Sequence, residues 1–181
     1  MINNLGESFL FLSFLMGIVG TIAFYFASKK KSNILVLVGE RSIKAVFSLL
    51  SLSVLLLVYL LVTKDYSNAY VAKNASNDLS IIYSIAALWA GQEGSLLLWS
   101  WILSMFAFIV TISKTFKPLI VSTEKTVLFI LSFFVFLIVV IENPFEVLSS
   151  APKNGRGLNP ILQNFYMAIH PLTLYVGYIA L

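Results

Sequence analysis

The first apolar stretch of the chain reads FLFLSFLMGIVGTIAFYFA, residues 9–27, and it contains no charged side chain. A helix of this length crosses the roughly 30 Å hydrocarbon core of a bilayer at 1.5 Å per residue. Uncharged stretches follow at about 45–62, 96–113 and 126–141, and a shorter one at 170–181. The pattern predicts an all-α, polytopic membrane protein in a single membrane domain over 1–181, with about four complete spans and an incomplete fifth.

The composition excludes a soluble protein. Of the 181 residues, 59% are hydrophobic and 11% are charged, whereas soluble domains carry about 25% charged residues. The net charge of +4 is assigned to the loops that orient the spans, so no nucleic-acid partner is predicted. The fifth stretch is too short to cross a bilayer, which predicts a fragment, or one piece of a split protein, without activity of its own.

Basic residues mark one side of the predicted bundle. Lys29, Lys30, Lys31, Arg41 and Lys44 lie between the first two stretches, and three more lysines lie between the third and fourth. The positive-inside rule places these connections in the cytoplasm. The loops over 63–95 and 142–169 are then predicted to face outward.

The segment ALWAGQEGSLLLW, residues 86–98, places a carboxylate between apolar stretches. In residues 79–90 before it, apolar residues repeat at helical spacing on one side and small residues lie on the opposite side. This pattern predicts an outward-facing interfacial helix. The glycines predict a turn into the third span, with Glu93 near the positive end of the helix that follows. We expect a structural or docking role for this turn, formed by Gly91, Gln92, Glu93 and Gly94.

His170 is the only histidine of the chain. Because a residue before proline resists helical geometry, His170 and Pro171 predict the start of the fifth span. A helix N-terminus disfavours the charged imidazole, and the neutral ring is the form that binds a metal. One histidine cannot complete a zinc site, but it can be an axial ligand of haem iron. The alternative is an interfacial histidine that caps the helix.

Arg156 lies between two glycines in APKNGRGLNP, residues 151–160. Its guanidinium could pair with a carboxylate such as a haem propionate; the alternative is a solvated loop charge. Asn159 and Pro160 predict the start of a short helix. The tryptophans at 89, 99 and 101 are interpreted as interfacial belt residues, or as a wall for a flat macrocycle. No catalytic residue is assigned, because the chain has no cysteine and no Ser-His-Asp or phosphate-loop pattern.

Several of these segments, taken in order, carry a family resemblance. ALWAGQEGSLLLW, GRGLNPILQ and IHPLTLYVGYIAL, with YVAKNASNDL and NPF between the spans, resemble the CcmF family of cytochrome c-type biogenesis proteins. These are haem-handling membrane proteins, and the resemblance covers only the N-terminal portion of a family member.

The resemblance implies part of a haem lyase, which takes b-type haem from a chaperone and promotes its thioether attachment to a Cys-x-x-Cys-His apocytochrome c. His170 would be an axial ligand of the haem iron. Implied partners are the haem chaperone, apocytochrome c and the proteins that handle it, and a second polypeptide with the C-terminal portion. The implied location is the inner membrane of a bacterium or a mitochondrion, with the haem site on the outer face.

The residues leave one other interpretation open and argue against a third. A non-catalytic assembly or scaffold subunit of a cytochrome biogenesis or transport complex would use the small-residue stripe and the outer loops for docking, and haem co-purification separates it from a lyase. A transporter requires ionisable residues within the spans, and the four predicted spans contain none.

Overall fold

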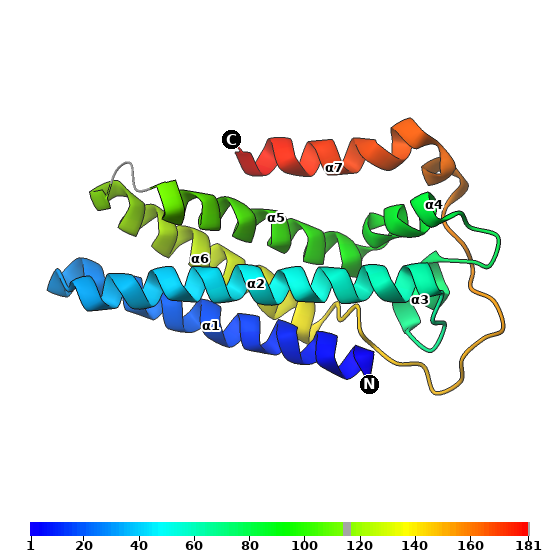
Figure 1. The fold of residues 1–181 in the computed structure, drawn as a ribbon, viewed down its shortest axis with the longest axis horizontal. Helices are drawn as coiled ribbons and strands as arrows, with labels where there is room; N and C mark the ends of the chain where they lie inside the picture. Colours follow the sequence, from blue (N-terminus) through cyan, green and yellow to red (C-terminus); the bar gives the residue numbers. More distant parts are fainter. Residues whose placement is uncertain (114–116, 181) are drawn as a thin grey trace.

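Four long helices, side by side and alternating in direction, form the body of the protein (Figure 1). The computed structural model describes residues 1–113 and 117–180, with side chains for all of these except 117–120. The long helices are α1 (Ile2–Lys30), α2 (Asn33–Thr63), α5 (Gln92–Ser113) and α6 (Lys117–Val140). Each is long and apolar enough to cross a membrane, which agrees with the predicted all-α polytopic fold.

The long helices extend beyond the uncharged stretches from which they were predicted. The 31 residues of α2 correspond to a rod of about 46 Å, so its end turns reach past a roughly 30 Å hydrocarbon core. Charged residues are compatible with these turns because a helix satisfies its own backbone hydrogen bonds inside or outside the bilayer.

The start of α6 corrects one prediction. The apolar span of this helix covers Val121–Val140 and so includes Glu124, which the sequence placed in a loop. Glu124 is buried, and Oγ1 of Thr111 on α5 donates to its Oε1 at 2.9 Å. The expectation that the complete spans contain no ionisable residue is therefore wrong for α6.

Short helices and loops cover one end of the bundle (Figure 1). This end, which we call the cap, consists of residues 64–91 and 141–164. Its helical elements are α3 (Ala69–Asn74), α4 (Ile81–Ala86) and the 3₁₀ turns η1 (Ala87–Trp89) and η2 (Pro160–Gln163). The cap places loop residues from distant parts of the chain against one another, at the end where α1 begins and α6 ends.

The small-residue stripe between 79 and 91 is buried only in its middle, because Ser80 is exposed and Gly91 is half-buried. Ser84 and Ala87 are buried, and α4 lies against α2. On the opposite side Ile81 and Ile82 are 65% and 66% exposed. Small side chains let the short helix approach the long one closely, which leaves the isoleucines available to the lipid interface.

The last helix, α7 (Phe165–Ala180), begins five residues before His170. Oδ1 of Asn164 accepts a hydrogen bond from the N–H of Tyr166 at 3.0 Å and so caps the helix. Nε1 of Trp89 donates to the carbonyl oxygen of Ala168 at 2.8 Å and holds this turn against the cap. The predicted helix start at His170 is wrong, because these contacts outweigh the hydrogen bond that Pro171 cannot donate. His170 is therefore not at the N-terminus of a helix, and the argument that the helix dipole favours its neutral imidazole does not apply.

Candidate functional site

Asn68 joins three segments of the cap. Its Oδ1 accepts from the N–H of Val71 at 2.9 Å and caps α3. Its Nδ2 donates to Oδ1 of Asn3 in α1 and to the carbonyl oxygen of Pro144, each at 2.9 Å. Asn68 is completely buried, so it fixes the start of α1, the start of α3 and the NPF segment relative to one another.

Backbone pairing strengthens the same junction. The N–H of Ala69 donates to the carbonyl oxygen of Glu146 at 2.9 Å, and the N–H of Leu148 donates to the carbonyl oxygen of Ser67 at 2.8 Å. Phe145 is buried, and its ring covers Gly6 of α1 so closely that a Cβ at position 6 would overlap it. The loop after α6 is therefore held along α3.

Tyr70 organises the turn between η1 and α5. Its hydroxyl lies 2.8 Å from the carbonyl oxygen of Ala87 and 3.0 Å from that of Leu88, and it accepts from the N–H of Gly91 at 3.1 Å. Burial raises the pKa of the Tyr70 hydroxyl well above its usual range, so the hydroxyl keeps its proton. A Cβ at Gly94 would overlap both the Leu88 carbonyl oxygen and this hydroxyl.

The segment from Gly91 to Gly94 is mostly helical rather than a four-residue turn, because α5 begins at Gln92. Glu93 lies in the first turn of α5, where a negative charge meets the positive end of the helix dipole. Its Oε1 pairs with Nζ of Lys73 at 3.1 Å, whereas its Oε2 is buried without a hydrogen-bond partner. Glu93 therefore links α5 to α3.

The glycine-rich loop around Arg156 caps the other end of α3. The N–H of Arg156 donates to Ala72 at 2.8 Å and that of Gly157 donates to Ala75 at 3.0 Å, which satisfies carbonyls that a helix end leaves open. Gly155 approaches so closely that a Cβ would overlap the Ala75 carbonyl oxygen. The sequence suggests a role for the charged side chain of Arg156, whereas in the structure its backbone N–H holds the loop against α3.

The Arg156 side chain is exposed and lines a hollow of about 460 Å³. Lys73, on α3, lines the same hollow. The other lining residues mix apolar and polar groups: Ala69, Ala72, Leu148, Ser150, Pro152 and Asn154. Two cations in one hollow suit an anionic group such as a carboxylate.

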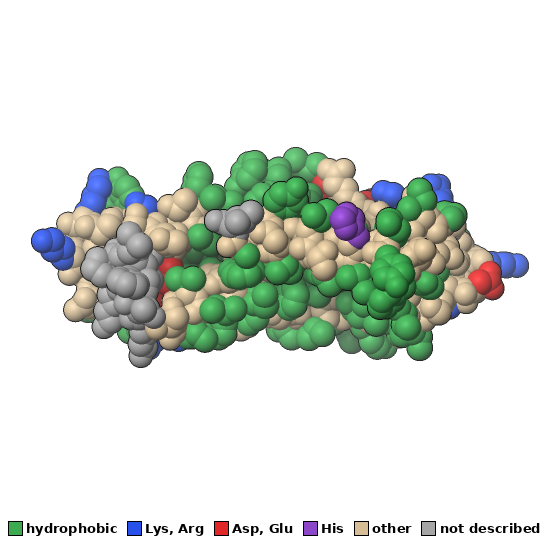
Figure 2. Space-filling model, turned by 90° about the horizontal axis from the view of Figure 1, so that it is seen from above, with side chains coloured by type: hydrophobic (Ala, Val, Ile, Leu, Met, Phe, Trp, Pro, Cys, Tyr) green, Lys and Arg blue, Asp and Glu red, His purple; other side chains and the backbone are tan. Residues whose placement is uncertain are grey.

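His170 lies on the exposed side of α7, which faces the viewer in Figure 2. Within the described part of the chain the structure shows no hydrogen bond to its imidazole; Oγ1 of Thr173 donates to its backbone carbonyl at 2.8 Å. The ring nitrogens are thus available to a ligand. The hollow beside Arg156 includes no residue of α7, so the two predicted binding residues do not line one pocket.

The three tryptophans contact different partners. Trp89 donates to the carbonyl oxygen of Ala168 in α7. The ring of Trp99 meets that of Tyr175, also in α7, edge-on with 5.3 Å between the ring centres. The indole N–H of Trp101 donates instead to Oγ of Ser51 at 2.9 Å. Trp89 and Trp99 therefore anchor the helix that carries His170. Sequence reasoning missed Asn68, Tyr70 and Asn164, whose only signal is a polar residue at a helix start or a tyrosine among small residues.

The sequence model of the cytochrome C assembly protein family matches residues 89–181, from the tryptophan that anchors α7 through Arg156 and His170. The chain belongs to this family. Membership implies haem handling; an imidazole and a guanidinium are the kinds of donor that haem iron and haem propionates use, although His170 and Arg156 lie apart.

Relatives in this family include two bacterial proteins. The chain is 32% identical to the cytochrome c-type biogenesis protein CcmF of Haemophilus influenzae over 182 residues, which cover 99% of this chain and 28% of that protein. It is 39% identical to the CcmF protein of Escherichia coli over 128 residues, or 69% of this chain and 20% of that protein. The chain thus spans less than a third of these relatives.

A solved structure shares the fold. The cytochrome c haem lyase CcmF superposes with a TM-score of 0.85 at 22% identity, over 99% of this chain and 28% of that chain. The four-helix body, the cap and α7 therefore follow the arrangement of that membrane protein.

Proposed function

We propose that this protein contributes the N-terminal part of a membrane haem lyase in cytochrome c maturation. The observation that carries the proposal is the family match over 89–181 together with an exposed imidazole on a helix that the matched tryptophans anchor. Trp89 and Trp99 fix α7, so they also fix the position of His170.

His170 is the proposed axial ligand of a b-type haem in transit. When bound, the haem supplies the iron and the vinyl groups that react with thiols of apocytochrome c. The contribution of this chain is positioning: a ligand on a fixed helix holds its partner near incoming groups, and well-oriented reactants gain large effective concentrations. Because these 181 residues contain a single histidine, we propose that any further axial ligand comes from outside them.

Arg156 is proposed to bind a haem propionate, with Lys73 as a second cation in the same hollow. Both belong to the cap, which the positive-inside prediction places on the outer face of a bacterial or mitochondrial inner membrane. A haem chaperone and apocytochrome c with its handling proteins would then approach this face. Lys73 is partly neutralised by Glu93 at 3.1 Å, which leaves Arg156 as the stronger contact.

A scaffold subunit is the second candidate function, and the cap itself favours it. The segments that resemble the family bind one another: Asn68 holds the NPF loop, Tyr70 holds the turn before α5, and Arg156 caps α3 through its N–H. These contacts build a docking surface without requiring haem.

The deciding experiment is the haem absorbance spectrum of the purified chain, alone and co-expressed with a C-terminal complement. We expect haem only with the complement, and its loss in His170→Ala. Leu174→Ala, one turn further along α7 and also exposed, is the matched control and should keep the haem. Arg156→Gln, with Lys153→Gln as its control, tests the propionate contact and should weaken haem retention by roughly tenfold or more.

Equal haem in His170→Ala and in the unmodified protein would remove His170 as the ligand. The absence of haem in every preparation would favour the scaffold function instead.

A further inference from the structure

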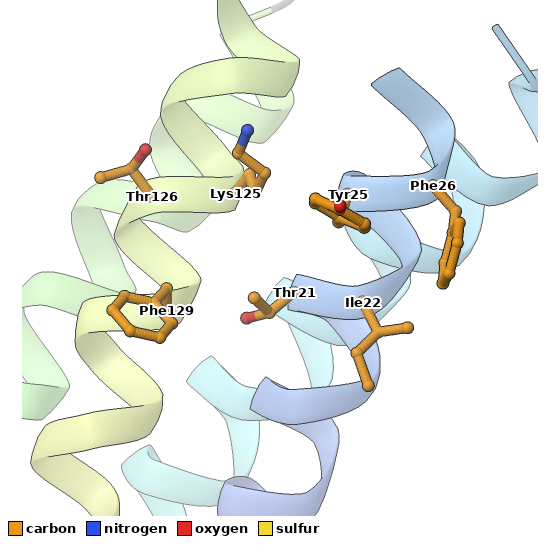
Figure 3. A pocket seen from close by; sticks show the side chains of 7 residues that line it. All are labelled: Thr21, Ile22, Tyr25, Phe26, Lys125, Thr126 and Phe129. Carbon is orange, nitrogen blue, oxygen red and sulfur yellow. The ribbon is translucent and has the colours of Figure 1, made fainter. Parts of the chain in front are cut away.

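A groove runs between α1 and α6. It consists of two hollows, of about 540 Å³ and about 340 Å³, that share Thr21, Ile22 and Phe129. The first is shown in Figure 3 and reaches toward the basic end of α1; the second reaches along the helices to Phe14 and Phe136. We call the two together the α1–α6 groove.

The walls of the α1–α6 groove are apolar even where hydroxyls line it. Oγ1 of Thr21 donates to the carbonyl oxygen of Gly17 at 2.8 Å, and Oγ1 of Thr126 donates to that of Ser122 at 3.1 Å. Ser132 donates to Leu128 at 2.7 Å. Because each hydroxyl proton is used within its own helix, the groove presents mainly hydrocarbon surface, which matches an alkyl chain rather than a polar ligand.

The basic end of the groove carries ammonium groups. Lys125 on α6 and Tyr25 on α1 lie on its two sides (Figure 3). Nζ of Lys29 donates to the Tyr25 hydroxyl at 2.6 Å and lies 4.4 Å from the centre of that ring. Among the side chains that the structure describes, no carboxylate lines either hollow, and the charged groups named here are positive.

We propose that the α1–α6 groove binds one acyl chain of a phospholipid with an anionic headgroup, whose phosphate lies against Lys125 and Lys29. Charge complementarity selects this occupant, because a neutral lipid or an apolar protein helix would fill the groove but place no negative charge beside the ammonium groups. The positive-inside prediction places this end in the cytoplasmic leaflet, where basic residues beside membrane helices attract anionic lipids.

The first test is native mass spectrometry of the purified protein titrated with phosphatidylglycerol or with phosphatidylcholine of the same acyl chains. We expect a single tighter site for phosphatidylglycerol. Lys125→Gln should weaken this site about fivefold, the equivalent of about 1 kcal/mol for one basic residue near the surface, and leave phosphatidylcholine unchanged. Lys153→Gln, which removes the same charge in the cap loop, should change neither affinity.

A second variant tests the apolar part independently of charge. Ile22→Trp fills the point at which the two hollows meet and should weaken both lipids, whereas Ile109→Trp on the exposed side of α5 should weaken neither. Circular dichroism verifies that both variants fold. Equal affinity for the two lipids, or variants that behave like their controls, would overturn the proposal. So would a photo-crosslinker at position 129 that captures a polypeptide in membranes rather than lipid.

Discussion

Tyr70 shows how much one side chain decides in the cap. Its hydroxyl contacts the first two residues of η1 and the residue before α5, and the approach is close enough to require glycine at position 94. A phenylalanine at position 70 would keep the ring but leave the N–H of Gly91 without its acceptor, the Tyr70 hydroxyl. A buried donor without an acceptor lowers the free energy of unfolding by about 1–3 kcal/mol, so the hydroxyl of Tyr70 contributes to stability in addition to its ring.

Gly94→Ala should lower the free energy of unfolding by about 1–3 kcal/mol, because its methyl group overlaps rigid backbone and a buried hydroxyl. Gly177→Ala is the control: its Cβ meets nothing within 4 Å, and alanine favours a helix by about 0.5–1 kcal/mol. Thermal unfolding in detergent, followed by circular dichroism, should separate the two variants. Equal midpoints would mean that the cap relaxes around the added methyl group.

The raised pKa of Tyr70 makes stability depend on pH in the alkaline range. The unfolded chain releases this proton near the ordinary value of 10.0, while the folded protein keeps it. The stabilisation is therefore complete below about pH 10 and falls above it, by up to about 1.4 kcal/mol per pH unit for one proton. Tyr70→Phe should reduce this slope in unfolding experiments between pH 9 and about 11.

Some slope should remain in Tyr70→Phe, because burial also raises the pKa of Tyr66. Tyr59→Phe, at an exposed position on α2, is the control and should keep the full slope. A Tyr70→Phe slope identical to that of the unmodified protein would show that another group titrates.

At the scale of elements, α7 depends on contacts made before its proline. Asn164 caps its start and Trp89 holds its first turn, while the Tyr175 ring meets Trp99 further along. The helix therefore passes through Pro171, and His170 projects from its middle. A local rule for proline predicts the wrong start because it does not include these contacts.

Asn164→Ala should loosen the first turn of α7 by about 1 kcal/mol, the usual cost of losing an N-cap. Hydrogen exchange should become faster at 165–169. Asn159→Ala removes an equivalent cap, a bond from the N–H of Ile161 at 3.0 Å, so its effect should stay within 160–163. Protection of 165–169 that does not change in Asn164→Ala would assign the helix start to Trp89 alone.

At the scale of the whole molecule, the basic ends of α1 and α2 and the cap lie at opposite ends of the bundle (Figure 1). Because the chain contains no cysteine, single cysteines report this orientation on a clean background. Ala151→Cys should react with an impermeant maleimide in intact cells, and Asn33→Cys only after permeabilisation. The reverse labelling pattern would show that the topology is opposite to the predicted one.

The cap also brings together segments that are distant in the sequence. Asn3 and Asn68 are brought together from different helices, and Asn68 then meets Pro144. The buried amide of Asn68 is satisfied by these partners, so the segments form one unit at the end of the bundle.

The sequence by itself determined the membrane class, the long helices and a short helix whose small residues Ser84 and Ala87 are buried. These features depend on local hydrophobicity, length and spacing, which can be read along the chain. The helix start at Asn159 and Pro160 was predicted for the same reason, and the side chain of Asn159 does accept from Ile161.

Only the tertiary structure decided where α7 begins, that Glu124 belongs to α6, and that α3 is the centre of the cap. Each of these depends on a partner from another part of the chain: Trp89 for α7, Thr111 for Glu124, and Asn3 with Pro144 for α3. The polar groups that will need a hydrogen-bond partner when buried can be identified from a single sequence. Packing in three dimensions selects the partner, since a buried donor or acceptor binds whichever group the fold brings within reach.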